Sequence, residues 1–280
     1  MAPTLYRGSR PATAHQGRAR DWAEIQERML VPLYDTVHDR LDVGPGTRLL
    51  ALNCGSGLAV LLAAARGATV TGYDADPDRL RLAAERAAVQ RRPGTLPRGS
   101  RPHAAAAVLR AGAPEEADLR DGGYGLVTAL DPATPADDLR PALSAVAGTA
   151  RPGSAVVLAG WGPPERCSAA RVLKVAARLA EPRGTAGPAP RLSGRDDLED
   201  LARDAGLRPD GSGRVSCPFG YQDKASAVRG LLSTGLFDAA VAATDQQQVE
   251  KEVAEALHPY RRPDGTVRME NVFRYLVARV

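Results

Sequence analysis

Two glycines and a carboxylate stand where the chain passes from one apolar segment through a turn to the next. Residues 48–52 form an apolar run, and the turn that follows reads Asn53-Cys54-Gly55-Ser56-Gly57. Gly55 and Gly57 lack a Cβ atom, so a ligand can approach their backbone, and a helix beginning just after them offers unpaired N–H groups. Asp74 ends the next apolar segment, where a carboxylate can accept both hydroxyls of a ribose. Turn, helix and acid in this order predict a nucleoside site.

The segments around this site alternate between strands and helices. Short apolar runs bounded by turn residues predict strands buried in a parallel sheet. The predicted strands are 48–52, 68–73, 104–110, 126–130, 155–159, 214–218 and 271–280. Helical spacing predicts helices over 58–66, 77–90, 137–147, 171–180, 196–205, 225–243 and 246–257. We therefore expect an α/β fold of the Rossmann-like type: a seven-stranded, mostly parallel sheet with helices on both faces and an antiparallel C-terminal edge strand.

The N-terminal region divides into two parts by composition. Residues 1–18 are rich in Pro, Gly, Arg and Ala without periodicity, which predicts a flexible tail. From Asp21 onward, Trp22 and the apolar residues after it recur at helical spacing, and Pro32 predicts a kink or a division of this helix. No second domain boundary follows, so residues 19–280 are expected to form one domain.

Charge and composition argue against several classes of partner. The formal net charge of +4 permits an anionic ligand, but the densest basic run, 91–101, contains Pro and Gly and no aromatic residue, unlike a nucleic-acid surface. No apolar run approaches the ~20 residues that span a bilayer, and the N-terminus lacks a secretory apolar segment. We expect a cytoplasmic protein that contacts neither nucleic acid nor membrane.

The cysteines and lysines carry two smaller expectations. Cys54, Cys167 and Cys217 have no metal-ligand spacing, and their odd number is atypical of a disulfide framework, so no metal is expected. Only three of the 37 basic residues are lysines, which with the Ala and Gly richness indicates a GC-rich, bacterial genome. The sequence does not determine the oligomeric state.

Several segments together resemble a known family. Residues 49–57 and 70–75 resemble the first two motifs of the class I S-adenosylmethionine-dependent methyltransferases. Residues 124–128 resemble the family's fourth strand, 150–158 its turn into strand five, and 205–207 the approach to strand six. The resemblance covers about residues 21–280. It implies a helical lid at 19–42, a cofactor-binding core at 43–160 and a helical insertion at 221–260.

The resemblance also implies a cofactor site. Gly55 and Gly57 would lie beneath the methionine part and the ribose of S-adenosylmethionine, Asp74 would hold the ribose hydroxyls, and Ala75 would flank the adenine. The cofactor-binding residues are thus expected to be Asn53, Cys54, Gly55, Ser56, Gly57, Asp74 and Ala75. A small molecule is the expected methyl acceptor. No catalytic residue is assigned, because methyl transfer needs mainly the alignment of nucleophile and methyl group.

The sequence departs from the family pattern at four positions, and a second interpretation stays open. Ala51, Ala113 and Gly125 stand where the family has acids, and Asn53 replaces a glycine, although asparagine tolerates the left-handed conformation. These changes favour a methyltransferase-fold protein that binds a ligand or cofactor without methylating. Asp131, just past the fourth predicted strand, is either a base at the ligand edge or a turn-forming residue before a proline.

Overall fold

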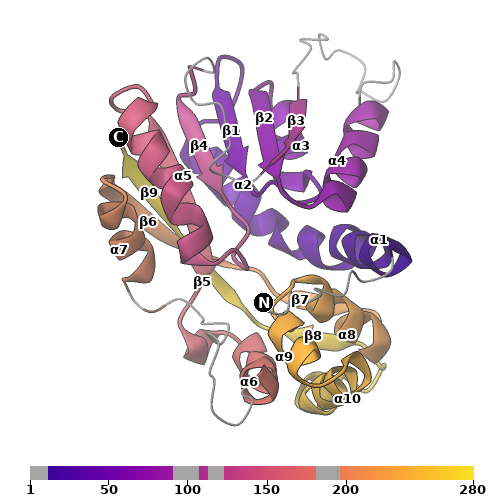
Figure 1. Cartoon of the computed structure of the whole chain (residues 1–280). Coiled ribbons are helices and arrows are strands. Elements are labelled where there is room, and N and C mark those ends of the chain that lie inside the picture. Colours follow the sequence, from indigo (N-terminus) through magenta and orange to yellow (C-terminus); the bar gives the residue numbers. More distant parts are fainter. Residues whose placement is uncertain (1–11, 91–106, 113–122, 181–193, 195) are drawn as a thin grey trace, which may run out of the picture.

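The structure is a computed structural model, and it describes residues 12–90, 107–112, 123–180, 194 and 196–280. A seven-stranded sheet in the order β3-β2-β1-β4-β5-β9-β6 forms its centre (Figure 1). Its strands are β1 (Arg48–Leu52), β2 (Thr69–Asp74), β3 (Ala107–Ala111), β4 (Leu126–Ala129), β5 (Ala155–Trp161), β6 (Arg208–Ser216) and β9 (Val272–Arg279). The pairs from β3 to β5 are parallel, and β9 is antiparallel to both β5 and β6. The predicted Rossmann-like sheet is confirmed, and its antiparallel C-terminal strand lies beside the edge strand β6.

Helices cover both faces of this sheet because its strands are apolar on both sides. In β1, Leu49 and Ala51 join one buried cluster, and Leu50 and Leu52 join the other, as expected when successive side chains point to opposite faces. The first cluster includes residues of α2 (Val31–Arg40), α3 (Leu58–Ala65) and α4 (Pro77–Gln90). The second includes residues of α5 (Ala136–Thr149) and α7 (Asp197–Asp204). The sheet is thus the middle layer of three.

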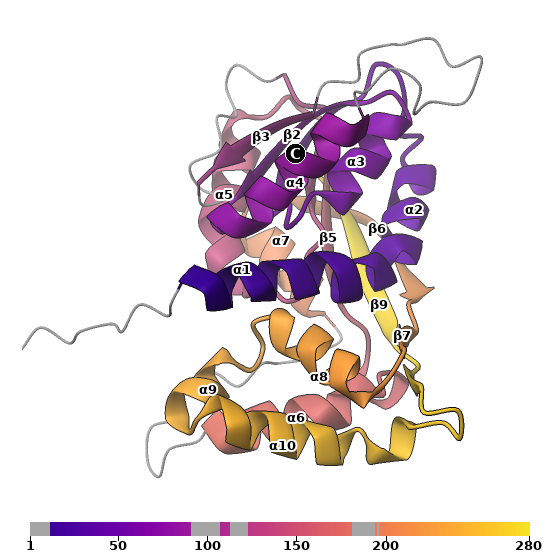
Figure 2. The ribbon, with the colours of Figure 1, turned by 90° about the vertical axis from the view of Figure 1, so that its right-hand side faces the viewer.

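A helical cap lies below the sheet, where the chain leaves the carboxyl end of β5 (Figure 1). It consists of α6 (Ala169–Ala180), α8 (Lys224–Ser233), α9 (Asp238–Ala243), α10 (Gln246–Ala256) and the hairpin of β7 (Phe219–Tyr221) with β8 (Val267–Met269). The first helix, α1 (Ala12–Asp21), lies between this cap and the core and contacts both α4 and α8 (Figure 2). The N-terminal segment therefore closes the edge of the sheet at which ligands bind in such folds.

The structure differs from the sequence expectations in its connections. Helix α1 begins at Ala12, so residues 12–18 of the predicted tail are helical, and residues 1–11 lie outside the described part. The single helix predicted over 225–243 is wrong: α8 ends at Ser233 and Gly235, at φ 87°, terminates it in the left-handed conformation. Strand β6 begins earlier than expected, at Arg208. It is an edge strand, and at a sheet edge the ladder tolerates Pro209, which has no N–H to donate.

The hairpin of β7 and β8 was not predicted, because each of its strands has only three residues. Within the described ranges, no helix combines the length and apolarity that crossing a bilayer requires.

Candidate functional site

The turn between β1 and α3 has the backbone conformation that its residues predict. Asn53, Gly55 and Gly57 all have positive φ angles, of 50°, 60° and 82°. The N–H of Cys54 donates to the carbonyl of Tyr73 at 2.8 Å, which ties the turn to the end of β2. Glycine is needed twice here for conformation, and Asn53 occupies the left-handed region that asparagine tolerates.

Asp74 completes this site from the last position of β2, and we call the turn 53–57 together with Asp74 the cradle. Its carboxylate accepts the N–H of Gly55 at 2.7 Å and the N–H of Asp76 at 2.9 Å, one on each oxygen. Burial raises the pKa of Asp74, while these N–H groups and the nearby charge of Arg79 oppose that rise. Each carboxylate oxygen has two acceptor positions, and these N–H groups take one on each oxygen. The Asp74 side chain is buried, with 5% of its surface exposed, and it does not line the cavity described below.

Trp22 and Glu27 reach the cradle from the N-terminal segment because that segment is not a regular α-helix. A π-helical turn spans Trp22–Gln26, in which the N–H of Glu27 donates to the carbonyl of Trp22. In an α-helix of 3.6 residues per turn, side chains five positions apart lie about 140° apart around the axis. The wider π turn instead brings Trp22 and Glu27 onto one face, and both are buried, with 2% and 1% of their surface exposed.

The carboxylate of Glu27 binds the start of α3. It accepts the hydroxyl of Ser56, the N–H of Leu58 at 3.3 Å and a guanidinium N–H of Arg86 at 2.8 Å. Arg86 also donates to the carbonyl of Ala23 at 2.7 Å, so it holds the N-terminal segment at two points. Burial raises the pKa of Glu27, and the bonds from Ser56 and Arg86 counteract this rise. The N-terminus of a helix favours an anion, and at the start of α3 the Glu27 carboxylate is that anion.

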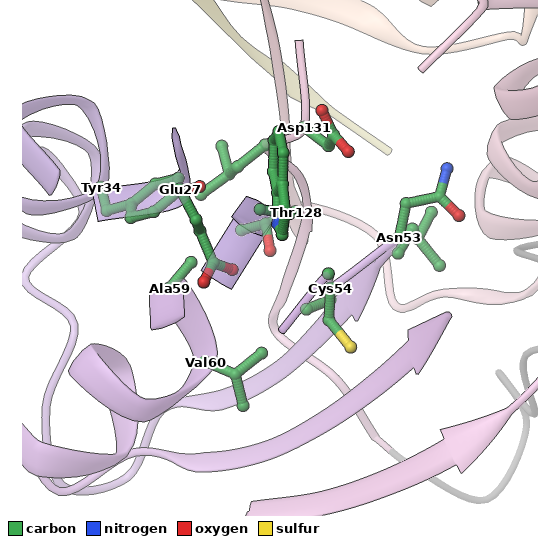
Figure 3. Close-up of a pocket in the computed structure, with 13 residues that line it drawn as sticks. Glu27, Tyr34, Asn53, Cys54, Ala59, Val60, Thr128 and Asp131 are labelled. Carbon is green, nitrogen blue, oxygen red and sulfur yellow. The ribbon is translucent and has the colours of Figure 1, made fainter. Parts of the chain in front are cut away.

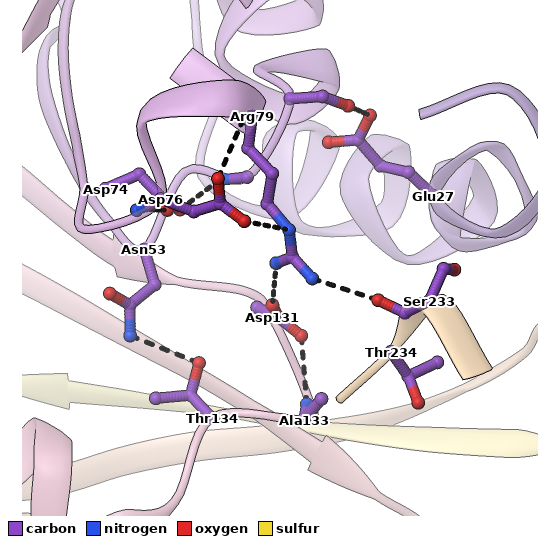
Figure 4. Close-up of polar contacts among 12 residues, drawn as sticks. Glu27, Asn53, Asp74, Asp76, Arg79, Asp131, Ala133, Thr134, Ser233 and Thr234 are labelled. Atoms are coloured by element: carbon purple, nitrogen blue, oxygen red, sulfur yellow. Dashed lines mark hydrogen bonds and ion pairs between the residues drawn. The ribbon is translucent and has the colours of Figure 1, made fainter. Parts of the chain in front are cut away.

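Arg79 on α4 brings a positive charge to the same place. Its guanidinium carbon lies 4.5 Å from the centre of the Trp22 ring, at cation–π distance. Figure 4 shows the guanidinium between Asp76, Asp131 and Ser233, with Nη1 3.4 Å from the Asp131 carboxylate and Nη2 donating to the Ser233 carbonyl at 3.2 Å. Arg79 therefore links the core to the cap across the site.

Asp131 forms a turn after β4, which is the turn-forming role, one of the two that the sequence left open. Its carboxylate accepts the N–H of Ala133 at 2.9 Å, and its carbonyl accepts the N–H of Thr134 at 3.2 Å. Burial raises the pKa of Asp131, and the charge of Arg79 opposes this. One carboxylate oxygen serves the turn and the other faces Arg79, so Asp131 has a structural role in this state.

These side chains leave little free space (Figure 3). The cavity between the cradle and the N-terminal segment measures about 20 Å³. Pockets for drug-sized ligands measure ≈ 300–1,000 Å³, and a single water needs roughly 10–15 Å³. The cavity is lined by Trp22, Glu27, Tyr34, Ala51, Leu52, Asn53, Cys54, Gly55, Ala59, Val60, Thr128, Leu130 and Asp131. The indole N–H of Trp22, on this lining, has no hydrogen-bond partner.

The predicted site residues occupy different environments. Asn53, Cys54 and Gly55 line the cavity, Ser56 is bonded to Glu27, and Gly57 is the N-cap of α3. The sulfur of Cys54 lies against Gly72 of β2, where a Cβ atom would be 2.9 Å from the sulfur, and it points away from the cavity (Figure 3).

Two other positions bear on the adenine part of the predicted site. Ala75 is exposed just past β2, so it does not line the cavity. Ala113, the position of a family acid, lies outside the described residues.

Sequence reasoning missed Glu27, Arg79 and Arg86, which supply most of the charge in the site. In a helical projection from Trp22, Glu27 falls on the polar face, so only the π turn makes it a site residue. Arg79 and Arg86 lie two turns apart on a strongly polar helix, where arginines are normally solvated. Their seven-residue separation on α4, two turns on one face, was the available signal. Within the described chain, no group of three His, Cys, Asp or Glu side chains could hold a metal ion.

The sequence matches no family model and no curated protein. Among solved structures, a Bacillus halodurans protein whose assignment as a methyltransferase is provisional has a TM-score of 0.54 at 14% identity, covering 87% of this chain and 97% of its own. A geranyl diphosphate methyltransferase has a TM-score of 0.50 at 14% identity, covering 88% and 76%. The chain has the class I methyltransferase fold. The [4+2]-cyclase SpnF is also similar, with a TM-score of 0.52 at 15% identity over 88% and 79% of the two chains.

Proposed function

We propose that the chain binds S-adenosylmethionine in the cradle and transfers its methyl group to a small-molecule acceptor. The observation that carries this proposal is Asp74, whose buried carboxylate at the end of β2 is oriented by the N–H groups of Gly55 and Asp76; each takes one acceptor position of an oxygen, and the second position on each oxygen is the one that a ribose would use. Two neighbouring hydroxyls of a ribose match two such positions. The geranyl diphosphate methyltransferase, which has the same fold, supports a small molecule as acceptor.

The residues present fit the adenosyl part of this cofactor. The left-handed Gly55 and Gly57 keep the turn free of Cβ atoms, and Asp74 supplies the acceptors. The space above Gly55 is taken by the chain itself, because a Cβ atom there would lie 3.2 Å from both the Trp22 indole nitrogen and the Glu27 carboxylate. The cradle therefore has the hydrogen-bonding groups that the ligand requires, but the N-terminal segment occupies the space that the ligand would take.

When bound, S-adenosylmethionine would supply a methyl group on a positively charged sulfur, for transfer to a nucleophile on the acceptor with S-adenosylhomocysteine, a neutral thioether, as the leaving group. The chain's own contribution is to bind, align and exclude water. Asp74 would hold the ribose, and the cap with α1 would shield the reacting groups from solvent (Figure 2). Asp131 is not assigned as a base, because Ala133 and Arg79 engage its carboxylate.

A second candidate function is ligand binding, or a different reaction, without methylation. Two observations favour it: the cavity of about 20 Å³, and Ala51, which brings no carboxylate to the site. The similarity to the [4+2]-cyclase SpnF supports the idea that this fold also serves other reactions. Under this function the chain binds its ligand and leaves S-adenosylmethionine unconverted.

Calorimetric titration with S-adenosylmethionine and S-adenosylhomocysteine tests the binding step. Replacing Asp74 by asparagine removes one charged acceptor, so we expect roughly 10- to 100-fold weaker binding, since hydrogen bonds to charged groups contribute about 1.5–3 kcal/mol. The matched control is Asp78→Asn on α4, whose carboxylate faces Arg81 rather than the cradle and should not alter binding. Equal affinity in the Asp74 variant and the wild type contradicts the site assignment.

Turnover is tested separately from binding. Formation of S-adenosylhomocysteine from S-adenosylmethionine, in the presence of a panel of small hydroxyl, amine and carbon nucleophiles, supports methyl transfer. Binding of both ligands without turnover on the panel favours the second function. No binding of either ligand up to millimolar concentration, in the wild type and in the Glu27→Gln chain described below, contradicts the cofactor itself.

A further inference from the structure

We propose that residues 12–30 are an intramolecular plug that occupies the cradle and must leave it before the cofactor binds. This plug comprises α1, the π turn Trp22–Gln26 and the 3₁₀ turn Glu27–Leu30. The inference rests on the proposed function for the identity of the ligand. The occupation of the cradle by the plug is a property of the chain itself.

The plug fills the cradle instead of roofing it. The indole nitrogen of Trp22 and the carboxylate of Glu27 both lie at 3.2 Å from the point where a Cβ atom on Gly55 would stand. A ligand lying against the glycine backbone would need this same space. The remaining volume of about 20 Å³ is room for roughly one water. Ligand and plug therefore exclude each other at Gly55.

The plug also satisfies charges that the ligand would otherwise meet. S-adenosylmethionine carries a carboxylate and a sulfonium cation. In the closed chain, the Glu27 carboxylate takes the N–H of Leu58 at the start of α3, and the Arg79 guanidinium lies against Trp22 with Asp131 beside it. The Glu27 carboxylate thus stands where an anion of the ligand would, and the Arg79 guanidinium stands where a cation would. Among the described side chains of the plug, the buried indole N–H of Trp22 lines the cavity without a hydrogen-bond partner.

The plug is attached by features that allow it to move as a unit. Within residues 16–21 only Ala19 is buried, and the ion pairs Arg18–Asp238 at 2.9 Å and Asp21–Arg229 at 3.3 Å are partly exposed, so they hold α1 weakly. A helix as short as α1 does not persist in water without its packing. The buried contacts of the plug lie towards its carboxyl end: Glu27 with Arg86, Gln26 with the Tyr221 hydroxyl at 2.9 Å, and the packed side chains of Trp22 and Leu30.

A hinge separates the plug from α2. Pro32 has no N–H, so the carbonyl of Arg28 accepts from Val31 in a 3₁₀ turn and the regular helical hydrogen bonding is interrupted there. Beyond this point, Leu33 and Val37 are fully buried and fix α2 in the core. Opening at residues 30–31 therefore releases Trp22 and Glu27 while α2 stays in the core, and it withdraws the buried side chain of Leu30 as well.

Closure lowers the apparent affinity for the cofactor by the ratio of closed to open chains. Weakening the Glu27–Arg86 contact should raise the open population and tighten ligand binding by the same factor. Glu27→Gln keeps the side-chain shape and removes the charge that Arg86 clamps. We expect at least tenfold tighter binding of S-adenosylhomocysteine by this variant. A direct ligand contact through Glu27 would produce the opposite change.

The experiment combines calorimetric titration with S-adenosylhomocysteine and amide hydrogen exchange read by mass spectrometry, on the full chain. The variants are Glu27→Gln and Arg86→Gln. If one of them fails to fold, the other still tests the proposal. The matched controls are Glu85→Gln and Arg81→Gln, which break an exposed ion pair of 3.1 Å on the same helix. We expect exchange in residues 12–30 to speed up at least tenfold in both plug variants, with α5 unchanged, and binding to tighten in parallel. The controls should match the wild type.

Each outcome separates the plug from the cofactor assignment. If residues 12–30 exchange no faster in the wild type saturated with S-adenosylhomocysteine than in the free wild type, or if the plug variants bind no more tightly than the controls, the plug is refuted and the cofactor stands. If residues 12–30 exchange rapidly in the plug variants and no chain binds the ligand, the cofactor assignment is refuted and the plug stands. Unchanged exchange in both plug variants refutes the role of the Glu27–Arg86 contact in holding the plug closed.

Discussion

Replacing Gly57 by alanine tests how closely α4 fixes the cradle. Gly57 has a φ of 82°, and a Cβ atom there would lie 2.8 Å from the Cβ of Ala83 and 3.4 Å from its Cα. A left-handed conformation costs an L-residue about 1–2 kcal/mol, and overpacking a buried contact costs about 1–3 kcal/mol. We therefore expect Gly57→Ala to lower the free energy of unfolding by roughly 2–5 kcal/mol.

Two further variants separate the backbone cost from the contact. Gly265 has a φ of 87° and no atom within 4 Å of its Cβ position, so Gly265→Ala should show the backbone cost alone, about 1–2 kcal/mol. Ala83→Gly removes the methyl group that the new side chain meets, at a cost of its own of roughly 2 kcal/mol from helix propensity and lost burial. The double variant should be more stable than the sum of the single effects by about 1–3 kcal/mol.

The assay is urea unfolding followed by far-ultraviolet circular dichroism, with the dependence of the free energy on urea compared among variants. Matching slopes show that the unfolding reaction is the same in each chain. The reasoning is refuted if the two substitutions add within about 0.5 kcal/mol. It is also refuted if Gly57→Ala costs no more than Gly265→Ala, because the contact with α4 would then contribute nothing.

Two other substitutions probe buried polar groups outside the cradle. Burial, with the charge of Arg66, lowers the pKa of His38 to about 4 from 6.5, so stability present above pH 6.5 is lost as the pH falls towards 4, by on the order of 3 kcal/mol. His38→Leu should flatten this part of the profile in urea unfolding at stepped pH; parallel profiles contradict it. Tyr221→Phe removes the 2.9 Å bond to buried Gln26 and should cost about 1–3 kcal/mol, whereas Tyr221→Phe with Gln26→Leu should recover most of it. A double variant no more stable than the single one contradicts that bond's role.

The sequence by itself determined the parts of the site that depend on neighbouring residues. An apolar run, a glycine turn, an apolar helix and a second run ending on Asp74 specify a strand–turn–helix–strand unit, because periodicity and left-handed φ angles are local properties. Asn53 was expected to tolerate the left-handed conformation and has φ 50°. The sheet followed from the same local patterns, since strands buried on both faces need helices on both sides.

Only the tertiary structure decided what fills the cradle. Glu27 meets Ser56 and Arg86 across long stretches of sequence, and no local pattern distinguishes it from the solvated acids of an N-terminal helix. The π turn that redirects it forms within a segment whose spacing reads as an ordinary α-helix, and the contacts of Trp22 with Gly55 and Arg79 accompany it. A glycine turn can be recognised from its own residues, whereas the space above it depends on side chains brought there by the fold.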